Sequence, residues 1–350
     1  MIKTFHQISK VKKEWIDLYS SNQEMSVYQS YEWNRNLFSR YKLLRADKQN
    51  YDYLFVACFD SNGSIRVIAP LTVPNNQNEP IMIGGGYTKT GLLNFIYAKD
   101  IQNEEFNEIL NYLYQSYPNH KLAFREIPRE TRFGSFLYRN NAFQVFFSRG
   151  SVRCSVPQTK EQLDKNLSKS VRQTIRTSYN RMRRNSVASK LEIHFGYKFQ
   201  NNEKCLLNDL QKERKKDWGL RIENENGNAL IRIKQYLRDT ITDPLFRFSK
   251  NKDFVYVKYI IDNQMAAFFI GLRNERRYCI VPTLIHNKDY KEYNPGLLMI
   301  YEFLCEEINT GDITVFDLSR GVDDYKLRYL PLPEIYEQDL YDCDNDKPFI

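Results

Sequence analysis

Two short segments in the second half of the chain carry residue types that could bind or activate a substrate. The first is Tyr290–Leu297, in which Asn294 suits the N-cap of a helix and Pro295 suits the first helical position. Gly296 would let a ligand approach the backbone closely. Free N–H groups and a positive dipole end make a helix N-terminus attractive to anions. The segment therefore predicts either an anion site or, as the plainer interpretation, an ordinary well-capped helix.

The second segment follows a predicted buried strand, Ile313–Leu318. Asp317, Arg320 and Lys326 lie within ten positions at the end of this strand. Because ligands collect at strand ends in α/β sheets, these three side chains are candidate catalytic residues. The alternative is a surface loop that holds an ion pair, either Asp317–Arg320 or Asp324–Lys326.

A third segment, Glu161–Arg184, predicts one amphipathic helix. Apolar residues recur at every third or fourth position, and basic residues, including Arg172 and Arg176, fall on the opposite face. A basic stripe is most often a solvated helix face, but it can also bind the phosphates of CoA, a nucleotide sugar or tRNA. Arg172, Arg176 and Trp218 are our candidate substrate-binding residues.

Signatures of other enzyme classes are absent from the sequence. It contains no G-x-S-x-G, no P-loop, no H-E-x-x-H and no G-x-G-x-x-G after a strand. The six cysteines are scattered and the four histidines show no ligand spacing, so we expect no metal site. Among the histidines, His286 is of most interest because it follows a predicted core strand.

The order of the predicted elements indicates an α/β (α+β) fold built on mixed, largely antiparallel sheets flanked by helices. Pro282 interrupts one predicted strand, and because proline cannot donate to a ladder, pairing should fail there. The predicted strands are Tyr53–Asp60 and Ile65–Val73, which form a hairpin, Lys121–Ile127, Phe254–Ile261, Gln264–Leu272, Arg277–Leu284 and Ile313–Leu318. Further predicted helices are Phe106–Tyr117, Lys204–Trp218, Asn228–Thr240 and Leu297–Ile308.

Length and composition indicate a folded protein of two domains. The chain has 350 residues, of which 42% are hydrophobic and 14% aromatic. Its net charge of +8 suits an anionic ligand such as a nucleotide or CoA, and does not exclude weak nucleic-acid binding. The scattered cysteines, the polar N-terminus and the lack of a long apolar run predict a cytoplasmic protein that does not insert into a membrane. We expect domains at 1–150 and 151–340 and an acidic tail at 341–350. The carboxylates towards this tail, Asp339, Asp342, Asp344 and Asp346, are expected to be frayed.

Three segments together resemble the GNAT-fold acyltransferases of the BioF2-like or CelD-like family, relatives of the Fem peptidyltransferases. They are Gln264–Gly271, Tyr290–Gly296 and Phe316–Lys326, and weaker similarity extends from about Gln29 to Leu330. The resemblance implies tandem GNAT-like domains, the second of which carries the thioester site. It implies that the acyl donor lies near Tyr293, Asn294, Pro295 and Gly296. It also implies that Lys326 stabilises the oxyanion and that Asp317 and Arg320 lie near the acceptor.

The functional prediction is an acyl-CoA-dependent N-acyltransferase, with acetyl-CoA as co-substrate. Its acceptor would be a small amine such as an amino sugar, in free form or as a nucleotide sugar, in polysaccharide or cell-envelope biosynthesis. The loop Tyr290–Gly296 keeps only the final glycine position of the usual CoA pattern, so a Fem-like transferase that uses aminoacyl-tRNA stays open. A third alternative is a GNAT-fold binding module without catalysis.

Overall fold

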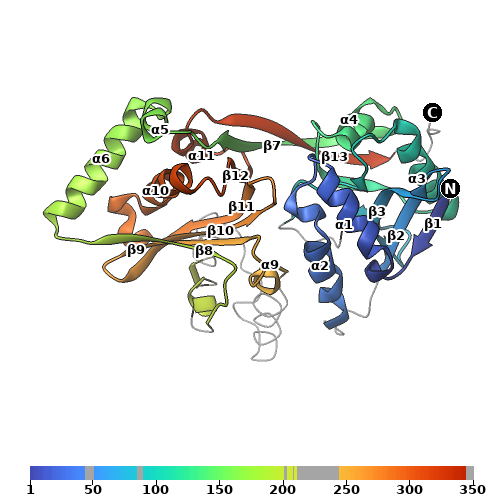
Figure 1. Ribbon diagram of the computed structural model, residues 1–350, viewed down its shortest axis with the longest axis horizontal. Coiled ribbons are helices and arrows are strands. Elements are labelled where there is room, and N and C mark those ends of the chain that lie inside the picture. Colours follow the sequence, from blue (N-terminus) through green and yellow to red (C-terminus); the bar gives the residue numbers. More distant parts are fainter. Residues whose placement is uncertain (44–50, 85–89, 201–202, 208, 211–243, 344–350) are drawn as a thin grey trace. The chain divides into compact units, whose positions relative to one another are not determined.

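A computed structural model describes residues 1–43, 51–84, 90–200, 203–207, 209–210 and 244–343 (Figure 1). The chain divides into two compact units. Unit 1 comprises Met1–Ser151 and Tyr336–Ile350, and unit 2 comprises Val152–Ile335. The segment from Tyr336 onward thus belongs with the N-terminal half of the chain, and not with the second domain in which we expect it.

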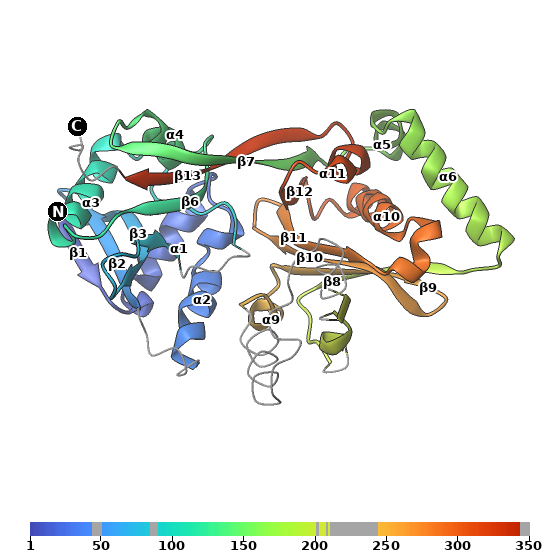
Figure 2. The same cartoon turned by 180° about the vertical axis from the view of Figure 1, so that it is seen from behind.

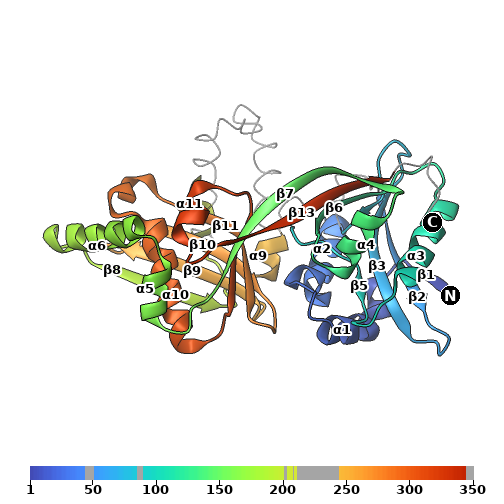
Figure 3. The same cartoon turned by 90° about the horizontal axis from the view of Figure 1, so that it is seen from above.

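Unit 1 is built on an antiparallel sheet whose strand order is β1-β2-β3-β4, with β5 also paired to β3. Successive apolar side chains of β2 point to opposite faces of the sheet, so both faces are apolar. Helices α1 and α2 pack on one face and α3 packs on the other (Figure 3). The predicted hairpin is confirmed, since β2 and β3 pair from Tyr51↔Pro74 to Phe59↔Ile65. The strands are β1 (Ile2–Phe5), β2 (Tyr51–Phe59), β3 (Ile65–Pro74), β4 (Met82–Ile83) and β5 (Ile96–Tyr97). The helices are α1 (Lys12–Ser21), α2 (Tyr31–Leu43), α3 (Asn103–Ser116) and α4 (Arg132–Arg139).

Three more strands contribute to unit 1. β6 (Ala123–Pro128) pairs antiparallel with β13 (Glu334–Cys343), and both β13 and β7 (Phe143–Ser155) contribute residues to the two units. Strand β13 contradicts the expectation of a frayed tail at Asp339 and Asp342. Asp339 is fully buried because it accepts two hydrogen bonds from Arg129, at 2.7 and 2.8 Å. Asp344 and Asp346, which were also assigned to the tail, lie outside the described residues.

Unit 2 is built on a sheet with the strand order β7-β12-β11-β10-β9-β8. Helices α6 and α10 cover one face, and α9 lies on the other (Figure 2). The pairs β8–β9, β9–β10 and β10–β11 are antiparallel, whereas β11 and β12 are parallel. The strands are β8 (Ser189–Phe195), β9 (Phe254–Ile261), β10 (Gln264–Arg273), β11 (Tyr278–His286) and β12 (Val315–Arg320). The helices are α5 (Lys160–Asn166), α6 (Lys169–Arg184), α9 (Pro244–Phe248), α10 (Pro295–Thr310) and α11 (Asp324–Tyr329), with a 3-10 turn, η4, at Lys288–Tyr293.

The predicted helix Glu161–Arg184 is two helices, α5 and α6. The helix breaks because the Ser168 side chain accepts a hydrogen bond from the Val171 N–H at 3.3 Å and caps a new helix. The predicted apolar face is nevertheless confirmed, since its members are buried or half-buried in the core of unit 2. Strands β8 and β13 were not predicted. The predicted helix Asn228–Thr240 and most of Lys204–Trp218 lie outside the described residues.

One buried acid makes the stability of unit 2 depend on pH. Glu307 of α10 is 2% exposed and accepts a hydrogen bond from the Ile313 N–H at 2.8 Å. Burial raises the pKa of this carboxyl from 4.5 to about 7. Because folding raises this pKa, the stabilising contribution of the protonated acid is complete below about pH 4.5 and is lost as the pH rises through about 7.

Replacing Glu307 by glutamine should therefore stabilise the protein at alkaline pH only. The amide oxygen still accepts from Ile313, and no charge is buried. At pH 8 the free energy of unfolding should rise by about 3 kcal/mol relative to wild type, with little difference at pH 4.5. Urea unfolding of both proteins at the two pH values checks this. An equal difference at both pH values would show that Glu307 does not titrate in this range.

Candidate functional site

Strands β11 and β12 separate after three residue pairs. Their parallel pairing covers Tyr278↔Val315, Cys279↔Phe316 and Ile280↔Asp317, although β11 continues to His286 and β12 to Arg320. The predicted failure of pairing at Pro282 is confirmed. Beyond Ile280 the facing edges of the two strands are not paired with each other, so the β11–β12 ladder ends there while both strands continue.

A bulge against β10 lies at the same place. Ile270 pairs with Thr283, but Leu272 pairs with Ile280, so Val281 and Pro282 together oppose Gly271. A Cβ atom on Gly271 would lie 2.8 Å from the Cys279 sulfur, so only glycine fits this position. The bulge therefore turns β11 away from β12 at the residue where their pairing ends.

Helix α10 begins beside the end of β11. A Cβ atom on Gly296 would lie 3.9 Å from His286 Nδ1, so His286 and the first turn of α10 are neighbours. The first turn contains no acidic residue, and Pro295 occupies a first-turn position as predicted. Asn294, however, is not the side-chain cap that we expect. Its backbone is left-handed, with φ 51°, and its side chain makes no capping hydrogen bond.

Helix α6 holds the turn that precedes α10. The Asn294 side chain donates to Ser178 Oγ at 3.0 Å, and the Asn185 side chain donates to the Tyr293 hydroxyl at 2.9 Å. Arg181 also donates to the carbonyl of Glu292. These contacts bring the four predicted donor-binding residues, Tyr293, Asn294, Pro295 and Gly296, together at the start of α10. Asn294 does not cap the helix because its backbone is left-handed, whereas an N-cap residue normally has an extended backbone.

The predicted substrate-binding arginines lie on the opposite side of the same helix. Arg172 and Arg176 are exposed, and neither makes an ion pair or hydrogen bond with another described residue. The structure does not bring them into contact with the turn at Asn294. Trp218 lies outside the described residues.

The three predicted catalytic residues gather at the end of β12. Asp317 is fully buried and accepts hydrogen bonds from the Ser319 N–H at 2.6 Å and from the Tyr278 hydroxyl. Ser319 and Gly321 have left-handed backbones, with φ 61° and 92°, so β12 ends in a sharp turn. The Asp317 carboxylate thus fixes the beginning of this turn. Arg320 is half-buried on it.

Lys326 fixes the same turn from α11. It is 4% exposed, and its ammonium donates to the carbonyls of Ser319 at 3.3 Å, Gly321 at 3.0 Å and Arg320. The Asp323 carboxylate lies 3.5 Å from Lys326 Nζ. An ammonium has three N–H donors, and here three backbone carbonyls accept from it. In this arrangement Lys326 positions the end of β12. The alternative of a surface pair with Asp324 is not observed, because the ammonium is buried and its charged neighbour is Asp323.

Both groups of residues lie at one edge of the sheet. β11 and β12 are parallel, so the start of α10, which adjoins the end of β11, and the turn after β12 are at the carboxyl ends of neighbouring strands. This is the edge at which open α/β sheets bind ligands. Sequence reasoning missed Ser178, Asn185 and Tyr278. A signal existed only for Ser178, a polar residue on the apolar face of a helix.

Among the described residues, no three His, Cys, Asp or Glu side chains are grouped so that they could hold a metal ion. The same residues contain no helix that is long and apolar enough to cross a membrane.

Residues 217–327 match the family model of the acetyltransferase (GNAT) domain. The fold is a GNAT fold. Three solved structures resemble the whole chain. The structure of FemX is 10% identical with a TM-score of 0.62, covering 97% of this chain and 96% of that one. A conserved protein of unknown function from Bacteroides thetaiotaomicron is 12% identical with a TM-score of 0.58, covering 98% and 100%.

The third is a tandem GNAT protein from the clavulanic acid biosynthesis pathway. It is 8% identical with a TM-score of 0.54, and the similarity covers 99% of this chain and all of that one. None of the curated proteins matches the sequence. The predicted tandem GNAT-like fold is therefore confirmed, and the GNAT domain and the fold together support a transferase.

Proposed function

We propose that the protein is an acyl-CoA-dependent N-acyltransferase that transfers an acyl group, with acetyl-CoA as donor, to a small amine. The observation that carries this proposal is the separation of β11 from β12 beside the uncapped start of α10. A phosphate group needs hydrogen-bond donors and positive potential, and the start of α10 supplies both. An amide-bearing chain such as pantetheine can pair with β11 on the side that faces β12, beyond Ile280.

A comparison of α10 with α3 supports the assignment of the donor to unit 2. Helix α3 begins with a capping box, in which Gln102 and Glu105 satisfy each other's backbone N–H groups, and Glu104 adds a second carboxylate. These acids repel an anion from the start of α3. Helix α10 has Gly296 and Leu297 at the positions of Glu104 and Glu105 and no side-chain cap. We infer one donor site per chain, at α10.

The acyl transfer needs only the acyl-CoA donor and the acceptor amine. The acceptor amine attacks the thioester carbonyl, an N–C bond forms, the C–S bond breaks, and the leaving thiolate takes up a proton. Backbone N–H groups of β11 on the side that faces β12 can stabilise the oxyanion. In this account Asp317 and Lys326 position the end of β12, and Arg320 is the candidate contact to the acceptor. The proton from the amine passes to water.

The acceptor class rests on the resemblance to the BioF2-like or CelD-like enzymes. We propose that the acceptor is an amino sugar, or its nucleotide derivative, used in polysaccharide or cell-envelope biosynthesis in the cytoplasm. Release of free CoA from acetyl-CoA, followed with a thiol reagent over a panel of amino sugars, tests this directly. A panel of aliphatic amines is the matched comparison. Saturable binding of acetyl-CoA without release of CoA with any amine would favour a binding module without catalysis.

The second candidate is a Fem-like transferase that uses aminoacyl-tRNA. Two observations favour it, namely the likeness to the FemX fold and the exposed arginines of α6. If Arg172 and Arg176 contact phosphates, then replacing both with glutamine should raise KM and weaken its dependence on salt. Stability should stay within about 0.5 kcal/mol of wild type, because both side chains are exposed.

Steady-state kinetics at low and physiological salt, with thermal unfolding in parallel, measures both effects. A double replacement of Lys99 and Lys121 by glutamine removes the same charge from exposed positions in unit 1 and is the control. Equal KM values for the arginine variant and this control would show that the basic stripe is only a solvated helix face.

A further inference from the structure

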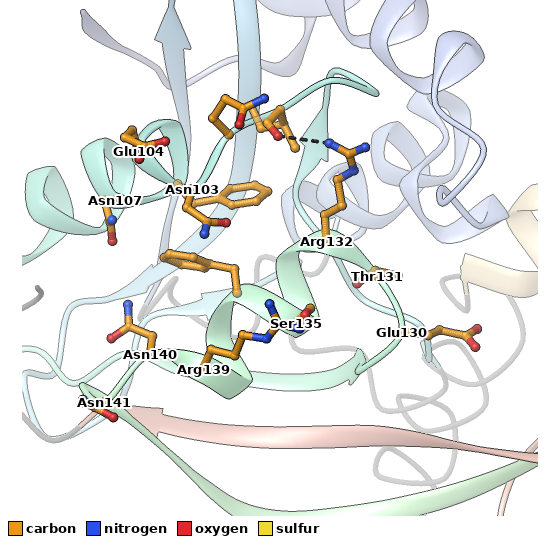
Figure 4. Close-up of a pocket in the computed structure, with 14 residues that line it drawn as sticks. Asn103, Glu104, Asn107, Glu130, Thr131, Arg132, Ser135, Arg139, Asn140 and Asn141 are labelled. Carbon is orange, nitrogen blue, oxygen red and sulfur yellow. Dashed lines mark hydrogen bonds between the residues drawn. The ribbon is translucent and has the colours of Figure 1, made fainter.

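Unit 1 has a hollow of its own, between the first turns of α3 and helix α4 (Figure 4). Its volume is about 710 Å³, enough for a molecule of the size of a monosaccharide or larger. The rings of Phe106 and Phe136, both almost fully buried, contribute its apolar part. All of its lining residues belong to unit 1, so this site is separate from the donor site at α10.

Carboxamides dominate the polar lining. Asn103 and Asn107 come from α3, and Asn140 and Asn141 follow α4 (Figure 4). A carboxamide both donates and accepts hydrogen bonds, as a sugar hydroxyl does. The Oδ1 atom of Asn107 is buried and accepts no hydrogen bond from any described residue. A buried acceptor without a donor costs about 1–3 kcal/mol, so this atom is ready to accept from a ligand hydroxyl.

The charges limit the ligand to one negative group. Arg132 is engaged, since it donates to the Ile101 carbonyl at 3.1 Å and pairs with Glu24 at 3.6 Å. Arg139 lines the hollow and makes no ion pair or hydrogen bond within the described chain. Glu104 and Glu130 also line it, and the capping box closes the start of α3 to anions. A diphosphate or a nucleic acid would therefore be repelled, whereas a single carboxylate can pair with Arg139.

We propose that this hollow binds a sugar that carries one carboxylate, a hexuronate-type ligand. The carboxylate pairs with the Arg139 guanidinium, and ring hydroxyls bond to the carboxamides of Asn103 and Asn107. The ring's apolar face lies over the edges of Phe106 and Phe136. This proposal does not rest on the proposed acyl transfer, and it would hold for a protein with no transferase activity.

Saturation-transfer NMR on the full chain tests it, with glucuronate, glucose and a glutamate dipeptide as probes at up to about 20 mM, a range suited to millimolar affinity. Glucuronate should bind more tightly than glucose. Arg139→Gln should weaken glucuronate at least ~10-fold and leave glucose unchanged. Asn107→Leu should weaken both sugars. Arg125→Gln, an exposed arginine outside the hollow, is the matched control and should change neither.

Since Arg139 is exposed, Arg139→Gln should fold as wild type does. This variant therefore tests the proposal even if Asn107→Leu does not fold. Three results would each overturn the proposal. They are the absence of any signal from glucuronate, an unchanged glucuronate affinity in Arg139→Gln, and tighter binding of the dipeptide than of either sugar.

Discussion

Replacing Gly296 by aspartate is expected to weaken acetyl-CoA binding at least ~10-fold. The substitution puts a carboxylate into the first turn of α10, where we place the phosphates of the donor. The fold should tolerate the change, because a Cβ atom there meets its nearest neighbours, His286 and Leu284, at 3.9–4.0 Å. An acid in a first helical turn also stabilises the helix. A titration of acetyl-CoA followed by thermal unfolding measures the loss.

Two controls separate charge from size and from general effects. Gly296→Ala adds only a methyl group at an open position, so any loss that it shares with Gly296→Asp is steric. Glu104→Gln removes an acid from the same helical position of α3, and it should leave acetyl-CoA binding unchanged. Wild-type affinity in Gly296→Asp, or a loss of acetyl-CoA binding in Glu104→Gln, would contradict the assignment of the donor to α10.

Replacing Lys326 by methionine is expected to cost about 2–4 kcal/mol of stability. The change leaves the carbonyls of Ser319, Arg320 and Gly321 without their buried donor. It also removes a charge that is only 4% exposed, whereas the Asp323 partner is 56% exposed and contributes little. Urea unfolding measures the loss, and Lys169→Met, the loss of an exposed lysine from α6, is the control.

The same variant decides between two roles for Lys326. If the ammonium stabilised the oxyanion, Lys326→Met would stay as stable as wild type while kcat fell about 100- to 1000-fold. If it positions the end of β12, stability falls, and activity recovers under conditions that restore the fold. Unchanged stability together with a lowered kcat would show that Lys326 stabilises the oxyanion.

The start of α10 shows what could be predicted from sequence and what could not. Pro295 identified the helix start, because its backbone preference is local. The same reasoning failed for Asn294, whose side chain bonds to Ser178, a residue 116 positions earlier. Its backbone is left-handed, not extended as at an ordinary N-cap. Local propensity predicts that a cap residue is present, but not which group its side chain will bind.

The charged residues after β12 show the same limit. Their position at a strand end was predicted from sequence, but the burial of Lys326 was not, because a lysine in a polar segment is normally exposed. Asp339 was placed in a frayed tail for the same reason. It is buried because it accepts from Arg129 and Ser148, 210 and 191 positions away, and from Tyr341, and no local pattern encodes the two distant partners.

Strand β8 was missed although its sequence carries a signal. Leu191, Ile193 and Phe195 alternate with Glu192 and His194, which is the pattern of a strand with one buried face. Strands β9, β10 and β11, by contrast, are long apolar runs with turn residues between them. All three were predicted to within a few residues. The pairing failure at Pro282 was predictable because it follows from a missing N–H group.

Calorimetric titration of acetyl-CoA into the wild-type protein tests the central claim most directly. The account predicts saturable binding with a stoichiometry of one per chain, because α10 offers an open helix start and α3 does not. Acetyl-CoA at a hundredfold its Kd should also raise the free energy of unfolding by about 2.7 kcal/mol. No heat of binding and no stabilisation by acetyl-CoA, while an aminoacyl-tRNA binds, would contradict the account and establish the Fem-like alternative.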